Sequence, residues 1–367
     1  MPSADARTAP TLVSLATAVP PHAVAQTEVR ALVARMFAGS EAGSARLLQV
    51  FDHSGIAQRH ICMPLEWYLS DRSFAEQNAL YVEQAQALGA AAGRAALERA
   101  GLEATDLDHV VFLSSTGIAT PSLDAHLSLA LGCRPECRRT PVWGLGCAAG
   151  AAGLSRARDL ALADPRARVL MVAVELCSLT FRREDLDKRN LVATSLFADG
   201  AAAVVVQGSA APRPPRTPHR PLALLASSST LWRDTLGVMG WTVSGQGLHV
   251  VFSRDIPAIV RERVRPGIDA FLERHSLSLA QIDHLVAHPG GAKVLAAYAD
   301  ALGRPPEAFA HAYEVLRTHG NMSSPTCLFV LERFLAAGDI RAGEHALVSA
   351  LGPGFSAEYV LARGAEV

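Results

Sequence analysis

The residues best suited to chemistry in this chain are a cysteine among small residues, a histidine before a Pro-Gly-Gly turn, and an asparagine. Cys147 lies in GLGCAAG, His288 in AHPGG and Asn321 in GNMSSP. A thiol at the start of a glycine- and alanine-rich helix faces the positive end of the helix dipole, which lowers the thiol pKa from about 8.5. We therefore predict that Cys147 is a nucleophilic thiolate and that His288 and Asn321 are its partners.

Two other interpretations of Cys147 are weaker. It could be a small buried residue packed under a helix, as free cysteines often are. However, Leu145 is the only large side chain between Gly144 and Gly153, so a bulky acyl donor could approach the sulfur. The same glycines suit a dinucleotide-binding loop poorly, because their spacing is G-x-G-x-x-x-G and no acidic residue closes a neighbouring strand.

Metal binding is the main alternative for the other candidates. His284 and His288 form H-x-x-x-H, but their segment has the pattern of a strand, where residues four apart are separated by about 13 Å. Cys133 and Cys137 lack a second pair of ligands. Asn321 alone could be an ordinary helix N-cap. We expect no metal site.

Composition excludes several functional classes. The 367 residues are 50% hydrophobic, with 34 basic and 35 acidic side chains, so neither nucleic acid nor an acidic membrane is expected as a partner. No apolar stretch approaches the ~18 residues of a membrane span, and the N-terminus lacks the pattern of a signal peptide. Six cysteines in such a chain indicate reduced thiols. We expect a cytoplasmic protein without membrane insertion.

Apolar runs alternate with helical patterns, which predicts an α/β fold with a sheet covered on both faces. A proline-rich segment at 209–221 divides the chain into expected halves at 1–208 and 222–367. The halves share a pattern, DLDHVVFLSS and QIDHLVAHPG, which indicates a duplicated unit. Helices are expected at 26–50, 78–100, 122–131, 147–163, 256–275, 291–302 and 325–337, and strands at 11–20, 108–113, 169–174, 201–206, 282–287, 345–350 and 357–362.

Six segments together resemble one known family in order and spacing: GLGCAAG, SLFADGAAAVVV, GLHVVFSRDIP, AHPGG, GNMSSP and ALGPGFSAE. They are similar to those of the chalcone synthase-like type III polyketide synthases of the thiolase superfamily, along nearly the whole chain. The resemblance implies a thiolase-like five-layered αβαβα fold with two duplicated halves. It also implies a homodimer, in which residues 118–121 would line the partner's cavity.

The same resemblance implies a Cys147–His288–Asn321 triad that uses an acyl-CoA starter and malonyl-CoA. The acyl group would move to the Cys147 thiolate, kept ionised by a His288 imidazolium. Decarboxylation of malonyl-CoA would leave an enolate, whose oxygen His288 and Asn321 would hold by donating hydrogen bonds. No bound metal or redox cofactor is required.

Further positions are implied by the resemblance alone. Phe197 would be a gatekeeper between the CoA tunnel and the cavity, and Glu175 a buried carboxylate behind the site. Arg46, His53 and Lys293 would contact CoA phosphates. Residues at cavity-lining positions are Ser115, Thr116, Cys177, Thr180, Met239, Trp241, Val250 and Ser323.

Some residues depart from the pattern of the plant enzymes. Ala193 and Ala198 stand where plant enzymes have glycine, and Cys177 where they have threonine. Val250 replaces a phenylalanine, and the lost ring could open room for an aliphatic chain. This favours a fatty acyl starter and an alkylpyrone or alkylresorcinol product.

Three rival functions make different predictions. A beta-ketoacyl-acyl carrier protein synthase III would share the fold and triad, but its histidine segment usually reads His-Gln-Ala-Asn rather than AHPGG. A papain-like hydrolase also uses Cys, His and Asn, but would carry a Cys-Gly-Ser-Cys-Trp segment near its N-terminus. A non-catalytic scaffold would have no reason to keep the triad and Phe197.

Overall fold

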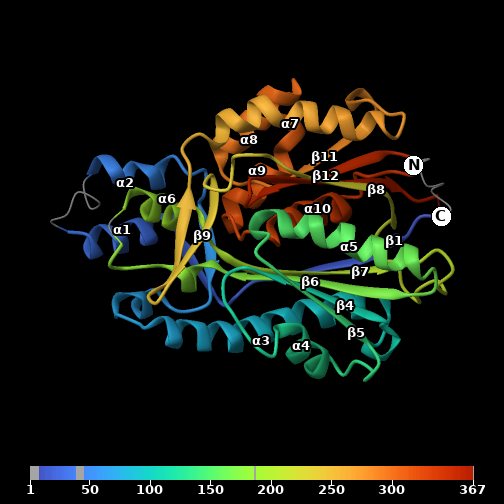
Figure 1. Ribbon diagram of the computed structural model, residues 1–367, viewed down its shortest axis with the longest axis horizontal. Coiled ribbons are helices and arrows are strands. Elements are labelled where there is room, and N and C mark those ends of the chain that lie inside the picture. The colour runs from blue at the N-terminus through green and yellow to red at the C-terminus, as the bar shows by residue number, and fades with distance from the viewer. Residues whose placement is uncertain (1–7, 39–44, 186, 367) are drawn as a thin grey trace.

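The computed structural model describes residues 8–38, 45–185 and 187–366 (Figure 1). Within these residues, nine strands form one mixed sheet in the order β11-β12-β13-β8-β1-β7-β6-β4-β5. Their bounds are β1 (Thr11–Ala18), β4 (His109–Ser114), β5 (Arg138–Trp143), β6 (Arg168–Leu176), β7 (Asp199–Gln207), β8 (Leu222–Leu231), β11 (His284–Ala287), β12 (His345–Gly352) and β13 (Ser356–Gly364).

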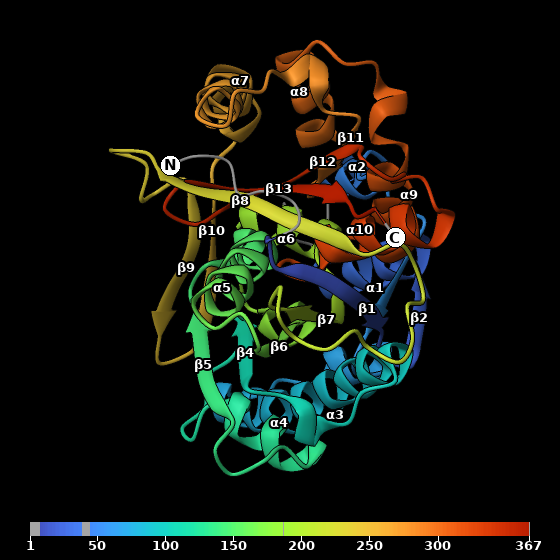
Figure 2. The same ribbon diagram turned by 90° about the vertical axis from the view of Figure 1, so that its right-hand side faces the viewer.

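Figure 2 shows that the sheet is folded into two strand layers with helices outside and between them. The two groups of strands meet where β1 pairs with β8 over only two residues, Thr11 and Leu12. The thiolase-like αβαβα fold expected from the sequence is confirmed. The layered helices are α3 (Phe74–Ala100) and α4 (Leu123–Leu131) on one outside, α5 (Ala149–Ala163) and α10 (Thr326–Ala337) in the middle, and α7 (Ile256–Glu273) and α8 (Ala292–Leu302) on the other.

The remaining elements, apart from α9, cluster at one end of the molecule (Figure 1). A two-stranded sheet of β2 and β3 and a hairpin of β9 and β10 flank short helices there. α9 links α8 to α10. The bounds are α1 (Gln26–Met36), α2 (Ala45–Asp52), α6 (Lys188–Leu196), α9 (Ala310–His319), β2 (His22–Ala25), β3 (Gln58–Ile61), β9 (Met239–Ser244) and β10 (Gly247–Phe252).

The two middle helices can pack closely because α5 begins with small residues. A Cβ atom added at Gly150 would lie 2.3 Å from the Ser324 carbonyl oxygen and 2.5 Å from the Cys327 Sγ. Only glycine fits there, so α5 approaches the start of α10 through its backbone. α10 is buried on nearly all sides, as expected for a helix that is apolar all round.

Most expected elements are confirmed with shifted ends. α3 begins at Phe74 rather than residue 78, because Ser73 and Glu76 form a capping box, and ends before Gly101 at φ 67° as expected. The single helix expected over 26–50 is wrong. α1 ends at Met36, ahead of an AGSEAGS segment whose glycines and serines disfavour helix; residues 39–44 of that segment lie outside the described residues.

Residues 208–221 contain no helix or strand and carry the chain from β7 to β8. The division into halves at 1–208 and 222–367 with a linker at 209–221 stays a prediction. No helix within the described residues is long and apolar enough to cross a membrane.

Candidate active site

The candidate residues follow the carboxyl ends of parallel strands. β4, β5 and β6 run parallel, and Ser115, Cys147 and Cys177 come after their respective ends. His288 follows β11, which runs parallel to β12 in the other half. Open α/β sheets bind ligands at this end of their strands. β11 runs opposite to β4, β5 and β6, because five antiparallel pairings separate the two groups, so the loops after the strands bring the candidates of the two halves together.

Cys147 lies in a 3-10 turn (Gly146–Ala148) that leads directly into α5, as the sequence predicted. Gly146 has φ 47°, a conformation that favours glycine, and its N–H donates a hydrogen bond to Ser115 Oγ at 3.0 Å. The turn also packs on Gly352, where an added Cβ would lie 2.5 Å from the Ala148 Cβ. Cys147 is thereby fixed from both halves and is only 5% exposed.

Asn321 lies in the loop after α9 and is 1% exposed. Its backbone N–H donates to the Leu196 carbonyl at 2.9 Å, and its own carbonyl accepts from the Ala198 N–H at 2.8 Å. These two bonds pair Asn321 with Phe197 as a parallel bridge. The loop that carries the asparagine is therefore held at the expected gatekeeper.

The Asn321 side chain connects the other two candidates. Its Oδ1 lies 4.0 Å from the Cys147 Sγ, with the thiol as donor, and its Nδ2 donates to the Gly290 carbonyl at 3.2 Å. Gly290 belongs to the turn after His288, and its N–H donates to the His288 carbonyl at 3.0 Å. The structure thus brings the three segments together around one carboxamide.

Burial sets the protonation states of this site. It raises the pKa of the Cys147 thiol to about 11, although hydrogen bonds with Ser323 and Asn321 act in the opposite direction. It lowers the pKa of the His288 imidazole to about 3. The predicted lowering of the Cys147 pKa and the predicted thiolate–imidazolium pair are therefore wrong. Loss of water outweighs the helix dipole, and both groups are neutral at neutral pH.

The His288 ring is positioned by its backbone. The backbone N–H of His288 donates to the Ser349 carbonyl of β12 at 2.8 Å. Neither ring nitrogen has a hydrogen-bond partner among the described residues. The ring is buried, at 5% exposure of the residue. Such a group is available to exchange hydrogen bonds and a proton with a substrate.

Glu175 is fully buried behind the site, as expected. Its carboxylate accepts hydrogen bonds from the Ser115 N–H at 2.9 Å, Thr116 Oγ1 at 2.8 Å, Ser114 Oγ at 3.3 Å and Ser324 Oγ at 2.9 Å. Burial raises its pKa to about 7 against these bonds. The carboxylate ties the end of β4 to the segment that starts α10.

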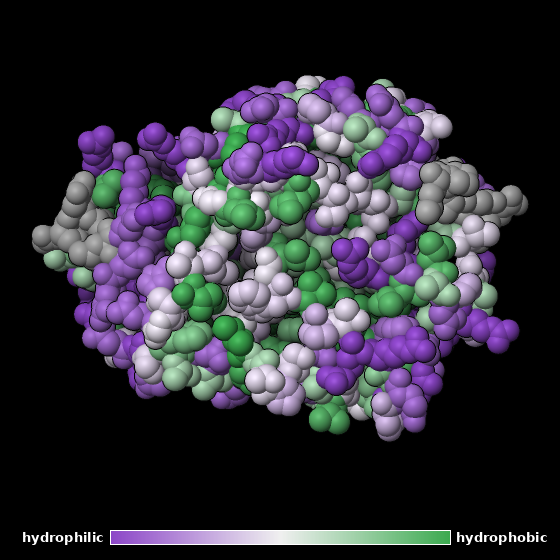
Figure 3. All heavy atoms as spheres, viewed as in Figure 1, coloured by the Kyte–Doolittle hydropathy of each residue, from purple (hydrophilic) through white to green (hydrophobic). Residues whose placement is uncertain are grey.

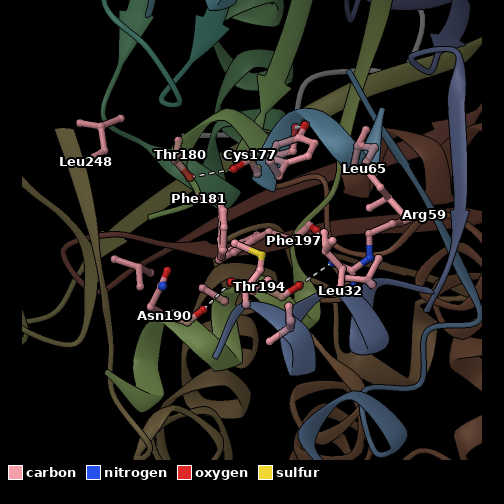
Figure 4. Close-up of a pocket in the computed structure, with 18 of the residues that line it drawn as sticks. Leu32, Arg59, Leu65, Cys177, Thr180, Phe181, Asn190, Thr194, Phe197 and Leu248 are labelled. Carbon is pink, nitrogen blue, oxygen red and sulfur yellow. Dashed lines mark hydrogen bonds between the residues drawn. The ribbon is translucent and has the colours of Figure 1, made fainter. Parts of the chain in front are cut away.

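Beside this site lies a pocket with about 700 Å³ of space between atoms, part of it open to solvent (Figure 4). Among the expected cavity residues, Cys177, Thr180, Trp241 and Val250 line it, together with Phe197. Thr116 instead lines a smaller neighbouring pocket, with Thr180. The expected residues outside the lining of the larger pocket are Ser115, Thr116, Met239 and Ser323.

Sequence reasoning missed the far wall of this pocket. Val29, Leu32, Val33 and Met36 line it from one face of α1. Their spacing is that of an apolar helix face, which the sequence does display, but such a face usually packs on a core. Arg59 of β3 was also missed, because a single arginine carries no pattern.

The expected CoA contacts are all exposed side chains: Arg46 on α2, His53 directly after α2, and Lys293 in the first turn of α8. A Cβ added at Gly55 would lie 3.2 Å from the Ala292 Cβ, so the segment after α2 packs against the start of α8. His53 and Lys293 therefore belong to adjoining segments.

The metal alternatives receive no support. His284 Nε2 lies 2.9 Å from Glu344 Oε2 and forms an ion pair there when protonated. Within the described residues, no group of three or more His, Cys, Asp or Glu side chains is arranged to hold a metal ion. The six cysteines, Cys133 and Cys137 included, are free thiols.

Comparison with known proteins decides the family. Residues 2–211 match the model of the N-terminal domain of chalcone and stilbene synthases, and residues 272–363 that of the C-terminal domain of 3-oxoacyl-[acyl-carrier-protein] synthase III. A putative chalcone synthase of Bacillus subtilis is 40% identical over 357 residues, 95% of this chain and 97% of its own. The chain belongs to the chalcone and stilbene synthase family.

Other relatives agree. The 1,3,6,8-tetrahydroxynaphthalene synthase of Streptomyces peucetius is 40% identical over 347 residues, 95% of this chain and 91% of its own. The structure of the Streptomyces coelicolor enzyme of that name, a bacterial type III polyketide synthase, superposes with TM-score 0.91 at 30% identity, over 97% of this chain and 100% of the other. The protein is a type III polyketide synthase, an acyltransferase, and the hydrolase and scaffold interpretations lose their basis.

The neutral resting site predicts how Cys147 reacts with iodoacetamide. Because its pKa is raised to about 11, the alkylation rate should rise about tenfold for each pH unit between about 7 and 9. Rates are followed by mass spectrometry of the peptide containing each cysteine. Cys133 is the internal control, because its hydrogen bond with Cys137 lowers its pKa to about 7 and its rate should level off. A pH-independent rate at Cys147 would instead indicate a standing thiolate.

Proposed function

We propose that the enzyme loads an acyl group from an acyl-CoA starter onto Cys147 and extends it with malonyl-CoA, with His288 and Asn321 as polar partners. The observation that carries this proposal is the Asn321 carboxamide, 4.0 Å from the Cys147 Sγ and bonded at 3.2 Å to the turn after His288. Cys147, His288 and Asn321 are far apart in the sequence, and the fold brings their segments together.

Loading begins from the neutral pair. As Cys147 Sγ attacks the thioester carbonyl, its proton passes to a free ring nitrogen of His288. The bond between the carbonyl carbon and the CoA sulfur breaks, and the CoA thiolate takes the proton from His288. Cys147 and His288 therefore carry charge only while substrate is present, which fits the raised pKa of Cys147 and the lowered pKa of His288.

Extension uses Asn321 and His288 as hydrogen-bond donors. Malonyl-CoA loses carbon dioxide, and the electron pair of the broken C–C bond forms an enolate at the thioester. Its oxygen accepts hydrogen bonds from Asn321 Nδ2, which has one N–H beyond that given to Gly290, and from a His288 N–H. The enolate carbon attacks the acyl carbonyl, the bond to Cys147 Sγ breaks, and the lengthened chain remains on CoA. CoA thioesters carry every group, with no bound cofactor.

CoA itself would lie at the exposed entrance. Arg46, His53 and Lys293 offer cationic or hydrogen-bonding side chains there for its phosphates. The packing of Gly55 on Ala292 supports a shared entrance for His53 and Lys293.

The starter is a fatty acyl group. The pocket beside the site is walled mainly by apolar side chains of α1, the β9–β10 hairpin and the segment after β6 (Figure 4). Phe197 lines this pocket and also pairs with Asn321, so it stands between the pocket and the triad. An aliphatic chain on Cys147 that passes Phe197 would bury its methylene groups, at about 0.8 kcal/mol each. Cyclisation of its extended product gives an alkylpyrone or alkylresorcinol.

The triad assignment is tested by products. Wild-type enzyme with malonyl-CoA and a panel of acyl-CoA starters should form polyketides, detected by mass spectrometry. Cys147→Ala should abolish them, and Asn321→Ala should lower kcat by about 100-fold or more, as loss of an oxyanion donor does. Cys327→Ala, a buried thiol on α10, is the matched control. Retained activity of Cys147→Ala, or extension from malonyl-acyl carrier protein but not malonyl-CoA, would contradict the proposal.

The pocket assignment is tested at Val250. Val250→Phe inserts a ring into the pocket and should reduce kcat/KM for dodecanoyl-CoA by about tenfold while sparing hexanoyl-CoA, because overpacking costs about 1–3 kcal/mol. Val251→Phe is the control, since Val251 is its neighbour on β10 but lies outside the pocket lining. Equal effects of the two variants on both starters would refute the assignment.

Homodimer formation is supported by the free edge of the sheet. β5 is the last strand in the sheet order, and beside it Trp143 is 51% and Ile118 44% exposed. These two residues border a groove lined also by Tyr81 and Phe112. On the face drawn in Figure 3, hydrophobic residues gather between the polar outer helices. A second copy of the chain would cover this edge and bring residues 118–121 to its partner.

Trp143→Glu should therefore convert a dimer into a monomer in size-exclusion chromatography with light scattering, because it places a charge in the interface. Leu162→Glu is the control: Leu162 is similarly exposed, at 46%, but lies at the opposite end of α5 from Cys147. A monomeric wild-type protein would rule the dimer out.

A further inference from the structure

A buried arginine stands behind the gatekeeper. Arg59 of β3 is 2% exposed and lines the apolar pocket. Its Nη1 donates to the carbonyls of Thr194 at 2.7 Å and Phe197 at 2.6 Å, and its Nη2 donates to the Ser195 carbonyl at 2.6 Å (Figure 4). These carbonyls come at the C-terminus of α6, where they lack partners within the helix. The guanidinium thus caps α6 at the residue that forms the gate.

The same guanidinium reaches the far wall of the pocket. Its Nη2 also donates to Gln26 Oε1, and Gln26 is the first residue of α1. Gln26 Nε2 donates in turn to the Ser195 carbonyl at 2.9 Å and to Ser54 Oγ at 2.9 Å. One hydrogen-bond network therefore joins the start of α1 to the end of α6.

Among the described residues, no carboxylate forms a salt bridge with Arg59. Asp199 is the carboxylate that interacts with it electrostatically, but the Asp199 oxygens are engaged by the Ser178 N–H and hydroxyl and by the Cys62 N–H. Burial lowers the pKa of Arg59 to about 10, so the side chain stays charged at neutral pH. A charge buried in this way is costly, and a neutral residue could fill the space. What the arginine provides is a fork of donors fixed in one plane.

We infer that Arg59 is a positioning residue for starter selection, which holds the Phe197 gate in a fixed place relative to the α1 wall of the acyl pocket. This inference rests on the proposed use of that pocket by fatty acyl chains. A long chain touches both the gate and α1, so its alignment depends on the distance between them. A short acyl chain reaches only Phe197, so its alignment depends less on the hydrogen bonds of Arg59 and Gln26.

Arg59→Lys tests the inference, because an ammonium keeps the charge but cannot span the four acceptors. We expect kcat/KM for dodecanoyl-CoA, divided by kcat/KM for hexanoyl-CoA, to fall by about tenfold, the effect of losing a charge-assisted hydrogen bond. Gln26→Met is the second variant. It removes the link to α1 and leaves the Arg59 bonds to α6, and it should shift the same ratio in the same direction.

Arg158→Lys is the matched control. Arg158 also donates to two backbone carbonyls, Leu224 at 3.0 Å and Leu225 at 2.8 Å, but it lies outside the pocket lining. It should lower the melting temperature without changing the starter ratio. If Arg59→Lys and Gln26→Met lower the melting temperature and leave the ratio unchanged, their role is structural and the inference is overturned. If wild-type enzyme rejects dodecanoyl-CoA, the acyl-pocket proposal fails first, and the inference with it.

Discussion

Two backbone hydrogen bonds hold the candidate site together. The Asn321 N–H and carbonyl pair with Leu196 and Ala198, on either side of Phe197. Residues more than 120 positions apart in the chain are thereby locked in register, as in a short strand pair. The bridge places a carboxamide over Cys147 on one side and the Phe197 ring at the pocket on the other. The candidate site and the apolar pocket consequently share one wall and cannot be positioned independently.

Exclusion of water is the second constraint, and it accounts for the charge states around the bridge. Burial raises the pKa values of Cys147 and Glu175 and lowers that of His288, so each group is driven towards its neutral form. A hydrogen bond to a charge that forms transiently in such a site is stronger than it would be in water. The burial of Cys147, His288 and Asn321 suits the proposed reaction, in which an enolate must attack carbon before water protonates it.

The sequence predicted the parts of the site that depend on local pattern. The glycines around Cys147 predicted the start of a helix, and the buried strand and Pro-Gly-Gly around His288 predicted a strand end; the structure agrees with both. The exposed strand before Cys147, β5, was not predicted. The sequence did not predict the protonation states of Cys147 and His288, because desolvation depends on neighbours from the whole fold. Nor did it predict the α1 wall or Arg59. An apolar helix face such as that of Val29 and Leu32 has the same pattern whether it meets a core or a cavity.

The residues proposed to set the type of reaction and those proposed to set the product therefore lie in different elements of the fold. The segments of the proposed triad are short and lie in loops beside the large sheet, whereas α1, α6 and the β9–β10 hairpin lie at one end of the molecule. Arg59 lies where these two regions meet, since its donors hold the gate from the side of the pocket. Changes in starter preference within the family should consequently act through the contacts between α1, β3 and α6 rather than through the proposed triad.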